Sequence, residues 1–280
     1  MGSGFIISKD GYILTNDHVA GNATKIVVTL TNGEKYDAKI IGTDVVSDIA
    51  LLKIEGDNFP YVTLGNSDDV IIGEWAIAFG NPFGLFDIND KPTVTVGVIS
   101  STGMKLGQVE NRYYRDMIET DAAINGGNSG GPLVNANGEV IGMNTLIYTA
   151  GQTNTYIGYG FAIPVNKVKR IVNELKSRGK VARNITAGFD WQSVDGRIAR
   201  YLGMKKAEGI IVSDIVAGGP AEKAGLRIGD VVLAVNGEKI SSGDDILAMM
   251  MDMKPGDALS LTVYRERRTI SLQLILEKAE

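Results

Sequence analysis

A glycine-rich stretch around one serine is the part of the sequence best suited to chemistry. Residues 125–133 read NGGNSGGPL, with the serine at position 129. Glycines on both sides of a serine permit a tight turn and the close approach of a substrate carbonyl. Such a turn can aim backbone N–H groups at one point, where they stabilise negative charge developing on an oxygen. We therefore predict Ser129 as a nucleophile and Gly127, Asn128 and Ser129 as an oxyanion hole. The alternative is a glycine-rich hairpin loop with an incidental serine.

A serine hydroxyl is a weak nucleophile unless a base takes its proton. The chain has one histidine, His18, in the stretch TNDHVA, where we expect a strand to end. A third group must orient the imidazole and stabilise its charged form. Asp48, at the mouth of the apolar stretch IALLKI, is the candidate, because a carboxylate there is costly without a partner. Asp44 competes with it. The alternatives are a surface histidine and solvated turn carboxylates.

The order of these residues along the chain separates two classes of serine hydrolase. Residues 127–131, GNSGG, also fit the G-x-S-x-G nucleophile elbow of α/β-hydrolases, in which the histidine follows the serine. No histidine follows Ser129 in this sequence. The order His18, Asp48, Ser129 is instead that of chymotrypsin-like proteases. The sequence thus predicts these three residues as the catalytic residues of a peptidase and argues against an esterase.

Short strand-like stretches dominate the chain up to residue 164. Apolar and β-branched residues fill them, and turn signals such as Asp10-Gly11 and Asn137-Gly138 separate them. We expect strands over 4–7, 12–15, 25–30, 37–44, 49–54, 75–79, 93–100 and 133–134. This spacing predicts an all-β barrel or sandwich that would position the candidate catalytic residues.

Helical periodicity begins after Pro164 and marks the domain boundary. Asn166 is the expected N-cap, apolar residues recur at helical spacing as far as Leu175, and Gly179 lies where the helix should end. The remainder of the chain has a mixed α/β pattern. We expect strands there over 209–214, 230–235, 259–264 and 269–276, and helices over 220–224 and 244–253.

The composition argues against several classes of protein. The formal net charge is −5, which disfavours nucleic acid as a partner. The chain has no cysteine and one histidine, so we predict no metal site and no cofactor. No apolar run reaches the length of a membrane span, and no signal peptide is visible. We expect that the natural N-terminus, with any signal or anchor segment, lies upstream of Met1.

The chain resembles the HtrA (Deg) family of serine proteases along its whole length. The stretches that carry the resemblance occur in order: GSGFII at 2–7, TNDHV at 15–19, SDIALL at 47–52, GNPFG at 80–84, GNSGG at 127–131 and GYGFAIP at 158–164. Their joint occurrence is highly specific, whereas each one alone would be weak. The resemblance implies a mostly β chain, with a chymotrypsin-like double β-barrel over 1–164 made of two six-stranded barrels. A linker helix over 165–180 and a smaller α/β PDZ domain over 181–280 would follow.

The same resemblance implies an activity and a setting. It implies ATP-independent cleavage of unfolded or misfolded proteins in the periplasm or elsewhere outside the cytoplasm. It also implies a homotrimer, although the N-terminal segment that packs such trimers would lie before Met1. One residue departs from the family pattern, because Asp17 stands beside His18 where the family more often has a neutral residue. We expect the Asp17 side chain to point outward.

A specificity pocket follows from the resemblance to the chymotrypsin-like fold. Its lining would be Ala123 and Ile124, just before the nucleophile, with Tyr148 and Tyr159 from a later strand. No acidic residue falls at the base of this pocket, and Asp121 is better explained as a structural carboxylate. We therefore expect cleavage after small aliphatic residues such as Val, Ala or Ile. The alternative is that these residues, Ile124 above all, are ordinary core.

Residues 181–280 resemble a PDZ domain of the permuted type found in HtrA proteases. The stretches GIIV at 209–212, PA at 220–221, AGL at 224–226, GDVV at 229–232 and VNG at 235–237 carry this resemblance. Such domains add a peptide to a sheet edge and hold its C-terminal carboxylate on backbone N–H groups. By resemblance, the peptide-binding residues would be Thr186, Ala187, Gly188 and Phe189 in the loop and Ile246, Met249 and Met250 on the facing helix. The methionines could instead fill the core. A catalytically silent scaffold that binds peptide C-termini is the alternative function.

Overall fold

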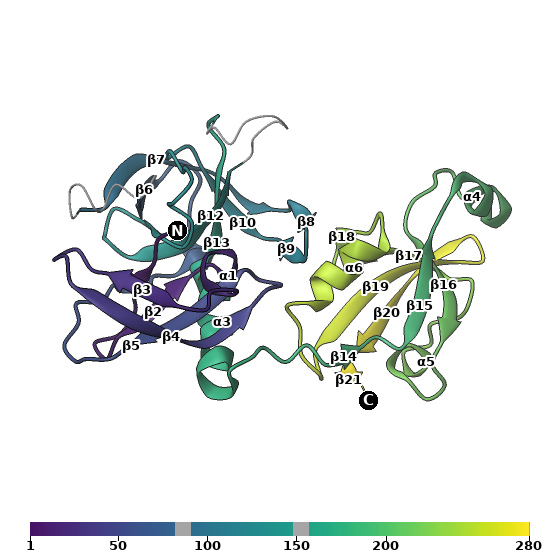
Figure 1. Cartoon of the computed structure of the whole chain (residues 1–280). Helices are drawn as coiled ribbons and strands as arrows, with labels where there is room; N and C mark the ends of the chain where they lie inside the picture. Colours follow the sequence, from purple (N-terminus) through teal and green to yellow (C-terminus); the bar gives the residue numbers. More distant parts are fainter. Residues whose placement is uncertain (82–90, 148–156, 280) are drawn as a thin grey trace. The chain divides into compact units, whose positions relative to one another are not determined.

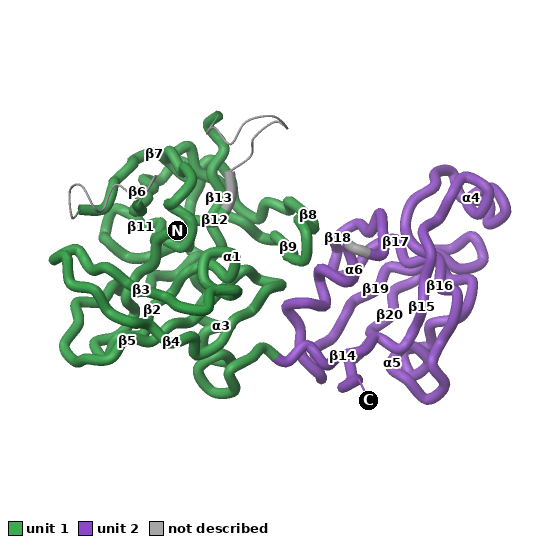
Figure 2. Tube along the Cα trace, in the orientation of Figure 1, with its two compact units in different colours: residues 1–181 green, residues 182–280 purple. Residues whose placement is uncertain are grey.

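The computed structural model describes residues 1–81, 91–147 and 157–279 of the chain. The chain divides into two compact units, Met1–Val181 and Ala182–Glu280, which Figure 2 colours separately. Each unit contains a hydrophobic core of its own. The two units are therefore described one at a time.

The first unit contains a five-stranded antiparallel sheet. Its order is β1-β2-β5-β4-β3, with β1 at Phe5–Ile6, β2 at Tyr12–Thr15, β5 at Ile49–Ile54, β4 at Lys35–Asp44 and β3 at Ile26–Thr29. Strands β2 to β5 of this sheet are labelled in Figure 1. Five of the six residues of the central strand β5 are buried. A strand covered on both faces has a continuous apolar sequence, which explains the run IALLKI. The expected six strands are wrong for this half, since the described residues place five strands in it.

The other sheet of the first unit closes into a six-stranded barrel. Its order is β6-β7-β10-β13-β12-β11, with bounds Trp75–Gly80, Thr93–Met104, Met117–Thr120, Gly160–Pro164, Val140–Ile147 and Pro132–Val134. Strand β11 pairs with both β12 and β6, and this second pairing completes the ring. The mostly β character predicted for this part of the sequence is confirmed.

Helix α3, Val165–Arg178, packs against both sheets of the first unit, contacting β4 and β5 on one side and β12 and β13 on the other. Its buried residues recur at helical spacing: Val165, Val168, Ile171, Val172 and Leu175. The helix that the sequence suggested as a linker over 165–180 thus contributes to the core of the first unit. It ends at Gly179, whose φ of 70° is a left-handed conformation that glycine adopts without steric cost.

The expected N-cap of α3 is wrong, because Pro164 and not Asn166 occupies that position. Pro164 is the last residue of β13, so the helix begins directly where the strand ends. Asn166 lies in the first turn, where its backbone N–H donates to Ser67 Oγ at 3.1 Å. Ser67 belongs to the short 3₁₀ helix η1, Ser67–Asp69. A side chain distant in sequence therefore satisfies a helix-terminal N–H group that has no partner within the helix.

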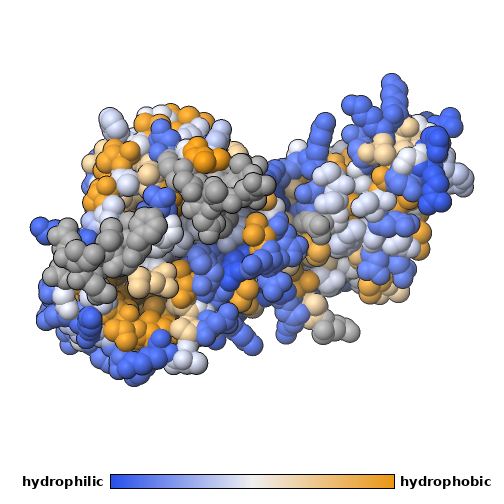
Figure 3. Space-filling view, turned by 45° about the horizontal axis from the view of Figure 1, so that its top comes forward, coloured by the Kyte–Doolittle hydropathy of each residue, from blue (hydrophilic) through white to orange (hydrophobic). Residues whose placement is uncertain are grey.

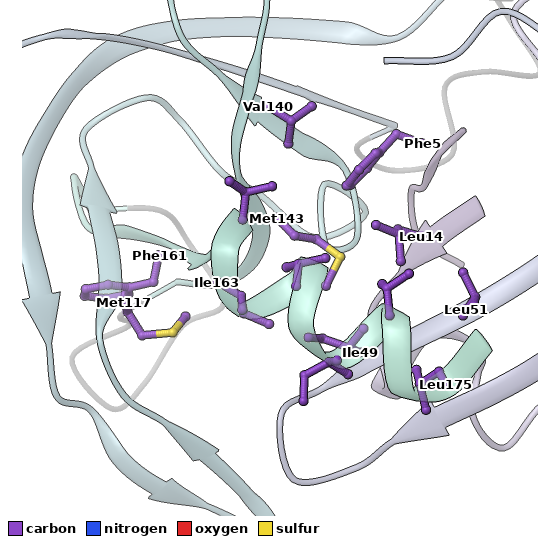
Figure 4. Packing of buried hydrophobic residues seen from close by; sticks show 14 of the residues in the cluster. Phe5, Leu14, Ile49, Leu51, Met117, Val140, Met143, Phe161, Ile163 and Leu175 are labelled. Atoms are coloured by element: carbon purple, nitrogen blue, oxygen red, sulfur yellow. The ribbon is translucent and has the colours of Figure 1, made fainter. Parts of the chain in front are cut away.

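One hydrophobic cluster joins the two sheets of the first unit through α3 (Figure 4). It brings together side chains from the first sheet, the barrel and the helix: Leu14, Ile49, Leu51, Val140, Met143, Ile163 and Leu175. Burying a side chain of this size contributes about 1.5–3 kcal/mol. The cluster fixes the two sheets relative to each other, which matters because the candidate catalytic residues come from both of them.

Two small elements complete the part of the first unit that carries the site. Helix α1, Asp17–Ala20, follows β2 directly. Strands β8, Gly107–Val109, and β9, Arg112–Tyr114, form a two-stranded hairpin between β7 and β10. The hairpin is tied to the first sheet by a hydrogen bond from the Tyr113 N–H to the Val46 carbonyl at 2.9 Å.

The second unit is an antiparallel sheet with three helices. The sheet order is β15-β16-β17-β19-β20, with bounds Phe189–Ser193, Ile210–Ile215, Val231–Val235, Ala258–Arg265 and Arg268–Ile275. The short pieces are β18 at Glu238–Lys239, which pairs with β17, and β14 at Ile185–Thr186, which pairs with β21 at Glu277–Lys278. The helices are α4 at Gly196–Leu202, α5 at Pro220–Lys223 and α6 at Gly243–Met250. The mixed α/β pattern expected here is confirmed, although α6 ends at Met250 rather than at residue 253.

Candidate active site

The first candidate residue, His18, lies at the second position of α1, three residues after β2 ends at Thr15, rather than at the strand end where we expected it. Its side chain is 33% exposed, so the imidazole remains accessible although its Nδ1 contacts Asp48. The Asn16 side chain donates to the backbone carbonyl of Asp48 at 2.9 Å. This bond ties the start of α1 to the turn between β4 and β5. The two segments that carry His18 and Asp48 are therefore fixed to each other by backbone as well as by side-chain contacts.

Asp48 is fully buried and has a φ of 58°, so the turn between β4 and β5 aims it inward. Its carboxylate accepts from the backbone N–H of His18 at 3.0 Å and from the His18 ring Nδ1 at 2.8 Å. Tyr114 Oη and Thr145 Oγ1 donate to the same carboxylate at 3.0 and 2.7 Å. The competing carboxylate Asp44 instead accepts from the Ser47 N–H within the turn. The geometry thus brings His18 together with Asp48.

The protonation state of this carboxylate follows from its surroundings. Burial alone would raise the pKa of Asp48, but the hydrogen bonds from His18, the charge of His18 and the bond from Thr145 outweigh burial and hold that pKa below its usual range. Burial raises the pKa of the Tyr114 phenol far above its usual range, and the neighbouring Asp48 charge adds to this. Asp48 is therefore an acceptor and Tyr114 a donor at neutral pH.

Ser129 lies in the loop before β11, on the other sheet of the first unit. Its Oγ donates to the backbone carbonyl of Thr145 at 3.0 Å. In the described part of the chain no hydrogen bond joins Ser129 to His18. A proton transfer from Ser129 to His18 Nε2 therefore requires the hydroxyl to exchange the Thr145 carbonyl for the imidazole. Catalytic hydrogen bonds often tighten in this way only when substrate binds.

The loop around Ser129 is held by a second serine that the sequence did not single out. Ser3 Oγ donates to the Gly127 carbonyl at 2.6 Å, and the Ser3 N–H donates to the Ser129 carbonyl at 2.9 Å. Gly127 has a φ of 101°, which glycine adopts without penalty. Within the described ranges, neither the Gly127 nor the Ser129 N–H donates to a protein acceptor. These two N–H groups are the ones that the sequence predicts as donors to a substrate oxygen.

The backbone N–H of Asn128 differs from those of Gly127 and Ser129, because it already has an acceptor. Its N–H donates to the Asn125 carbonyl at 2.9 Å and closes a turn. The backbone N–H of Asn128 is therefore engaged within the loop. The Asn128 side chain is buried, and its amide donates to the Ala123 carbonyl at 3.4 Å.

The predicted specificity pocket is only partly within the described residues. Tyr148 lies outside them. Ile124 is 1% exposed and belongs to the barrel core, where it packs against Gly160. Tyr159 is 48% exposed, and the Ala123 carbonyl accepts a hydrogen bond from Thr95 at 2.8 Å. Of the predicted pocket residues that the structure describes, Ala123 and Tyr159 are therefore the two that are not buried in the core.

The predicted peptide-binding residues of the second unit meet around β15 and α6. Phe189, Ile246 and Met250 are buried, and Met249 packs partly buried against the same cluster. Strand β15 lies at one end of the sheet order, so its outer edge is where a peptide strand could be added. The Gly188 N–H donates to Thr186 Oγ1 at 3.0 Å, so this donor is engaged within the loop. Ala187 is buried in the same cluster.

Two residues that the sequence did not predict as part of the site contact the Asp48 carboxylate from other elements, Tyr114 on β9 and Thr145 on β12. A third, Arg112 on β9, donates from Nε to Asp48 Oδ1 at 3.1 Å. No pattern of residue types marks them, since they lie 64 to 97 positions from Asp48. The expectation for Asp17 is wrong, because it is 4% exposed and pairs with Arg112.

Neither a metal cluster nor a membrane helix is found in the described ranges. Over residues 1–81, 91–147 and 157–279, no group of three or more His, Asp or Glu side chains is arranged to hold a metal ion. None of the helices in those ranges is long and apolar enough to cross a membrane.

The chain matches known protein domains in both of its units. Residues 2–143 match the trypsin-like peptidase domain, and residues 182–276 match the PDZ domain. A probable periplasmic serine endoprotease, DegP-like, of Chlamydia trachomatis is 48% identical over 271 residues, covering 97% of this chain and 52% of that protein. A protein of Pseudomonas fulva with the same description is 44% identical over 274 residues, covering 97% of this chain and 55% of that protein. The chain thus spans about half the length of these relatives.

Solved structures extend the similarity over both units. An HtrA-type protease, AlgW, with a decapeptide is similar with a TM-score of 0.76 and 36% identity, covering all of this chain and 83% of that one. A serine endoprotease from Yersinia pestis is similar with a TM-score of 0.64 and 33% identity, covering 89% of that chain. From its matched domains, its fold and these likenesses, the chain belongs to the HtrA family of serine proteases, with a chymotrypsin-like protease domain and a PDZ domain.

Proposed function

We propose that this chain is a serine endopeptidase with Ser129 as nucleophile, His18 as general base and Asp48 as the orienting carboxylate. The observation that carries the proposal is the fully buried Asp48, which accepts from both the backbone N–H and the ring Nδ1 of His18. This contact fixes the tautomer that leaves His18 Nε2 free to accept a proton. The family relationship supports the same reaction class.

The proposed reaction follows from these positions. His18 Nε2 takes the proton of Ser129 Oγ as that oxygen attacks the scissile carbonyl carbon. The N–H groups of Gly127 and Ser129 stabilise the negative oxygen, and Asp48 stabilises the imidazolium. The imidazolium then gives its proton to the leaving amine, and an acyl-enzyme remains on Ser129. Water, deprotonated by His18, releases the acid product and restores the serine.

The test compares the chain with its Ser129→Ala variant on an unfolded protein such as casein. We expect cleavage by the wild type, no cleavage by Ser129→Ala, and an unchanged thermal transition, because only one oxygen is removed. A fluorophosphonate probe should label Ser129, and chelators should have no effect. Ser213→Ala, which removes an exposed hydroxyl in the second unit, is the matched control and should behave as wild type. Labelling or cleavage that persists in Ser129→Ala would overturn the assignment.

The substrate class is a further part of the proposal. We propose that the substrates are unfolded or misfolded proteins cleaved without ATP, since each step of the reaction proposed above uses a base, a nucleophile, backbone donors and water. Ala123 and Tyr159 support a preference for small aliphatic residues before the cleaved bond, since neither adds a negative charge to hold Lys or Arg. The curated relatives are named periplasmic, which supports an extracytoplasmic location for this chain as well.

The PDZ domain is proposed to bind peptide C-termini. Its edge strand β15 supports addition of a peptide strand, and the neighbouring helix α6 offers Met249 as a partly exposed apolar contact. Ile246 and Met250 lie deeper in the same cluster and would form the floor of the groove. Binding without proteolysis, the alternative of a silent scaffold, would be shown by peptide affinity in a chain that neither cleaves casein nor reacts with the fluorophosphonate.

Self-association into a homotrimer is the remaining part of the proposal. The surface of the first unit carries hydrophobic patches among hydrophilic residues (Figure 3). Ile71, Ile72 and Trp75 are 68%, 61% and 60% exposed and lie close together in the sequence. Exposed apolar surface of this kind supports association. Sedimentation of the 280-residue chain measures it, and a monomer at every concentration would contradict this proposal for the chain tested.

A further inference from the structure

Arg112 joins the candidate catalytic carboxylate to a second buried carboxylate. Its Nε donates to Asp48 Oδ1 at 3.1 Å, and one terminal nitrogen pairs with Asp17 Oδ2 at 3.2 Å. The other terminal nitrogen pairs with Glu110 Oε2 at 3.0 Å. The Arg112 side chain is 13% exposed, whereas Asp17 and Asp48 are 4% and 0% exposed. Each nitrogen of the guanidinium thus meets a different carboxylate, two of them deeply buried.

The charges around His18 come from several elements. They are Asp17 on its own helix, Asp48 in the turn between β4 and β5, Arg112 and the neutral Tyr114 on β9, and Glu110 between β8 and β9. Glu110 is 77% exposed, so water screens its charge. Two buried carboxylates remain: Asp48, which contacts the imidazole, and Asp17, which precedes His18 in α1. Without Arg112, both would favour the protonated ring, which cannot act as a base.

We propose that Arg112 is a positioning residue for the reaction, bridging Asp48 to Asp17 so that the carboxylate is held toward His18 and the charge of Asp17 is offset. This inference rests on the proposed function of His18 and Asp48. The planar guanidinium suits the task, because it presents donors in a rigid fork and stays charged at every relevant pH. Burial lowers the pKa of Arg112, but the charges of Asp48 and Asp17, the hydrogen bond to Asp17 and the nearby Tyr114 together outweigh burial and raise that pKa, so the cation is retained.

The pair of Asp17 and Arg112 also explains how a carboxylate next to the candidate base is tolerated. Breaking a buried pair by removing one partner leaves an uncompensated charge, whereas removing both restores the balance. A cycle of two single variants and one double variant therefore separates charge compensation from general damage. Because the chain has a single histidine, NMR reports the titration of His18 without overlap.

The experiment titrates the imidazole by NMR in the Ser129→Ala background, so that it does not depend on activity. For Arg112→Gln, we expect the midpoint to move to higher pH by roughly 0.5–1 pH unit, since a nearby cation has been removed. Asp17→Asn should move it to lower pH, and the double variant should return close to the starting midpoint. Arg112→Lys, which keeps the charge and loses the fork, should leave the midpoint close to the starting value.

The matched control is Lys39→Gln, which breaks an exposed ion pair with Glu55 in the same unit and should leave the midpoint unchanged. In chains that retain Ser129, the acidic limb of the pH profile of kcat/KM should move with the NMR midpoint. Arg112→Gln should lower kcat at the high-pH plateau by about tenfold through misplacement of Asp48, with little change in KM. A purely structural role would lower stability and leave the midpoint in place.

Each outcome decides between the two hypotheses. If Ser129→Ala abolishes cleavage and labelling while Arg112→Gln leaves the midpoint unmoved, the inference fails and the proposed function stands. If Ser129→Ala keeps cleavage or labelling, the proposed function fails whatever the titration shows. Should Arg112→Gln not fold, Arg112→Lys and Asp17→Asn carry the test. An Asp17→Asn midpoint that stays in place would overturn the inference.

Discussion

At the scale of single residues, the Asp48 carboxylate is the centre of the site. It is fully buried, and four residues donate hydrogen bonds to it: His18, Arg112, Tyr114 and Thr145. Hydrogen bonds to an exposed carboxylate add little stability, because water could replace them. Without its hydrogen bonds, the buried Asp48 would be an unpaired charge shielded from water, which is costly. These bonds therefore stabilise the fold and orient the imidazole at the same time.

Asp48→Asn tests the orienting role. An amide cannot accept a bond from every donor that faces it, and it favours the wrong tautomer of His18. A loss of kcat of about 10⁴-fold is expected, the size known for this change in a chymotrypsin-like triad. The measurement is kcat on a peptide substrate at pH 8, beside Asp44→Asn, which alters the competing carboxylate in the same turn. Comparable losses in the two variants would contradict the assignment.

The lowered pKa of Asp48 predicts how stability depends on pH. A carboxylate with a lower pKa in the folded chain stabilises the fold above its unfolded value of about 3.9. That contribution is lost as the pH falls through the lower, folded pKa. The difference in free energy of unfolding between wild type and Asp48→Asn should therefore be largest above about pH 4 and shrink below it. Denaturant unfolding over pH 3–7 measures it, and a constant difference would show that Asp48 gains nothing from its partners.

At the scale of elements, the loop before β11 depends on glycine for space as well as for backbone freedom. A Cβ at Gly130, which has a φ of 87°, would clash with the Ser3 carbonyl and the Thr15 hydroxyl. A Cβ at Gly126, in the same loop, would meet nothing within 4 Å. Gly130→Ala should therefore displace Ser129 and abolish activity, whereas Gly126→Ala should retain it within a few-fold. Fluorophosphonate labelling rates of the two variants provide the comparison, and equal rates would contradict this account.

Helix α3 is the second element on which the site depends. Leu175 is fully buried between the helix and the first sheet, so Leu175→Ala should lower the free energy of unfolding by about 2–5 kcal/mol. Asn173→Ala, at an exposed position on the same helix, should cost less than about 0.5 kcal/mol. Chemical unfolding of the two variants measures both values. A small cost for Leu175→Ala would mean that α3 does not hold the two sheets together.

At the scale of the whole molecule, the proposed peptide binding by the PDZ domain has two possible consequences: substrate capture alone, or a change in the output of the protease domain as well. A peptide alters activity only if it binds active and inactive states with different affinity. A small chromogenic substrate that cannot reach the PDZ domain separates the two cases. An apolar-ended peptide should speed its hydrolysis if the domains are coupled and leave it unchanged under tethering alone.

Controls for this experiment follow from the loop at 186–189. The same peptide with an amidated C-terminus should lose its effect, because the carboxylate is the group that backbone donors would hold. Gly188→Ala should also abolish it, since a Cβ there would press on Pro220. Gly225→Ala, also at a positive φ but with nothing within 4 Å of its Cβ, reports the backbone cost alone. If the amidated peptide binds as well as the free acid, the proposed role of this loop is wrong.

The sequence by itself determined a large part of this picture. A single histidine leaves one possible imidazole base, and its order with Asp48 and Ser129 separates two hydrolase classes. Strand positions followed from alternation and from the apolar run of β5, because burial on a sheet face repeats every second residue. The change from β to helical spacing at residue 164 marked the start of α3. All of these are local properties of the chain.

Tertiary structure decided what depends on residues distant in sequence. It distinguished Asp48 from Asp44, since only the φ of 58° at Asp48 and the pairing of β2 with β5 bring that carboxylate to His18. It buried Asp17 against Arg112, 95 residues away, where the sequence suggested an exposed carboxylate. It also gave the Asn128 N–H an acceptor within a turn, the Asn125 carbonyl. It made Pro164 the N-cap of α3. The physical reason is the same in each case: the direction of a side chain and the partner of a polar group are set by strand register and loop closure, which composition and spacing do not encode.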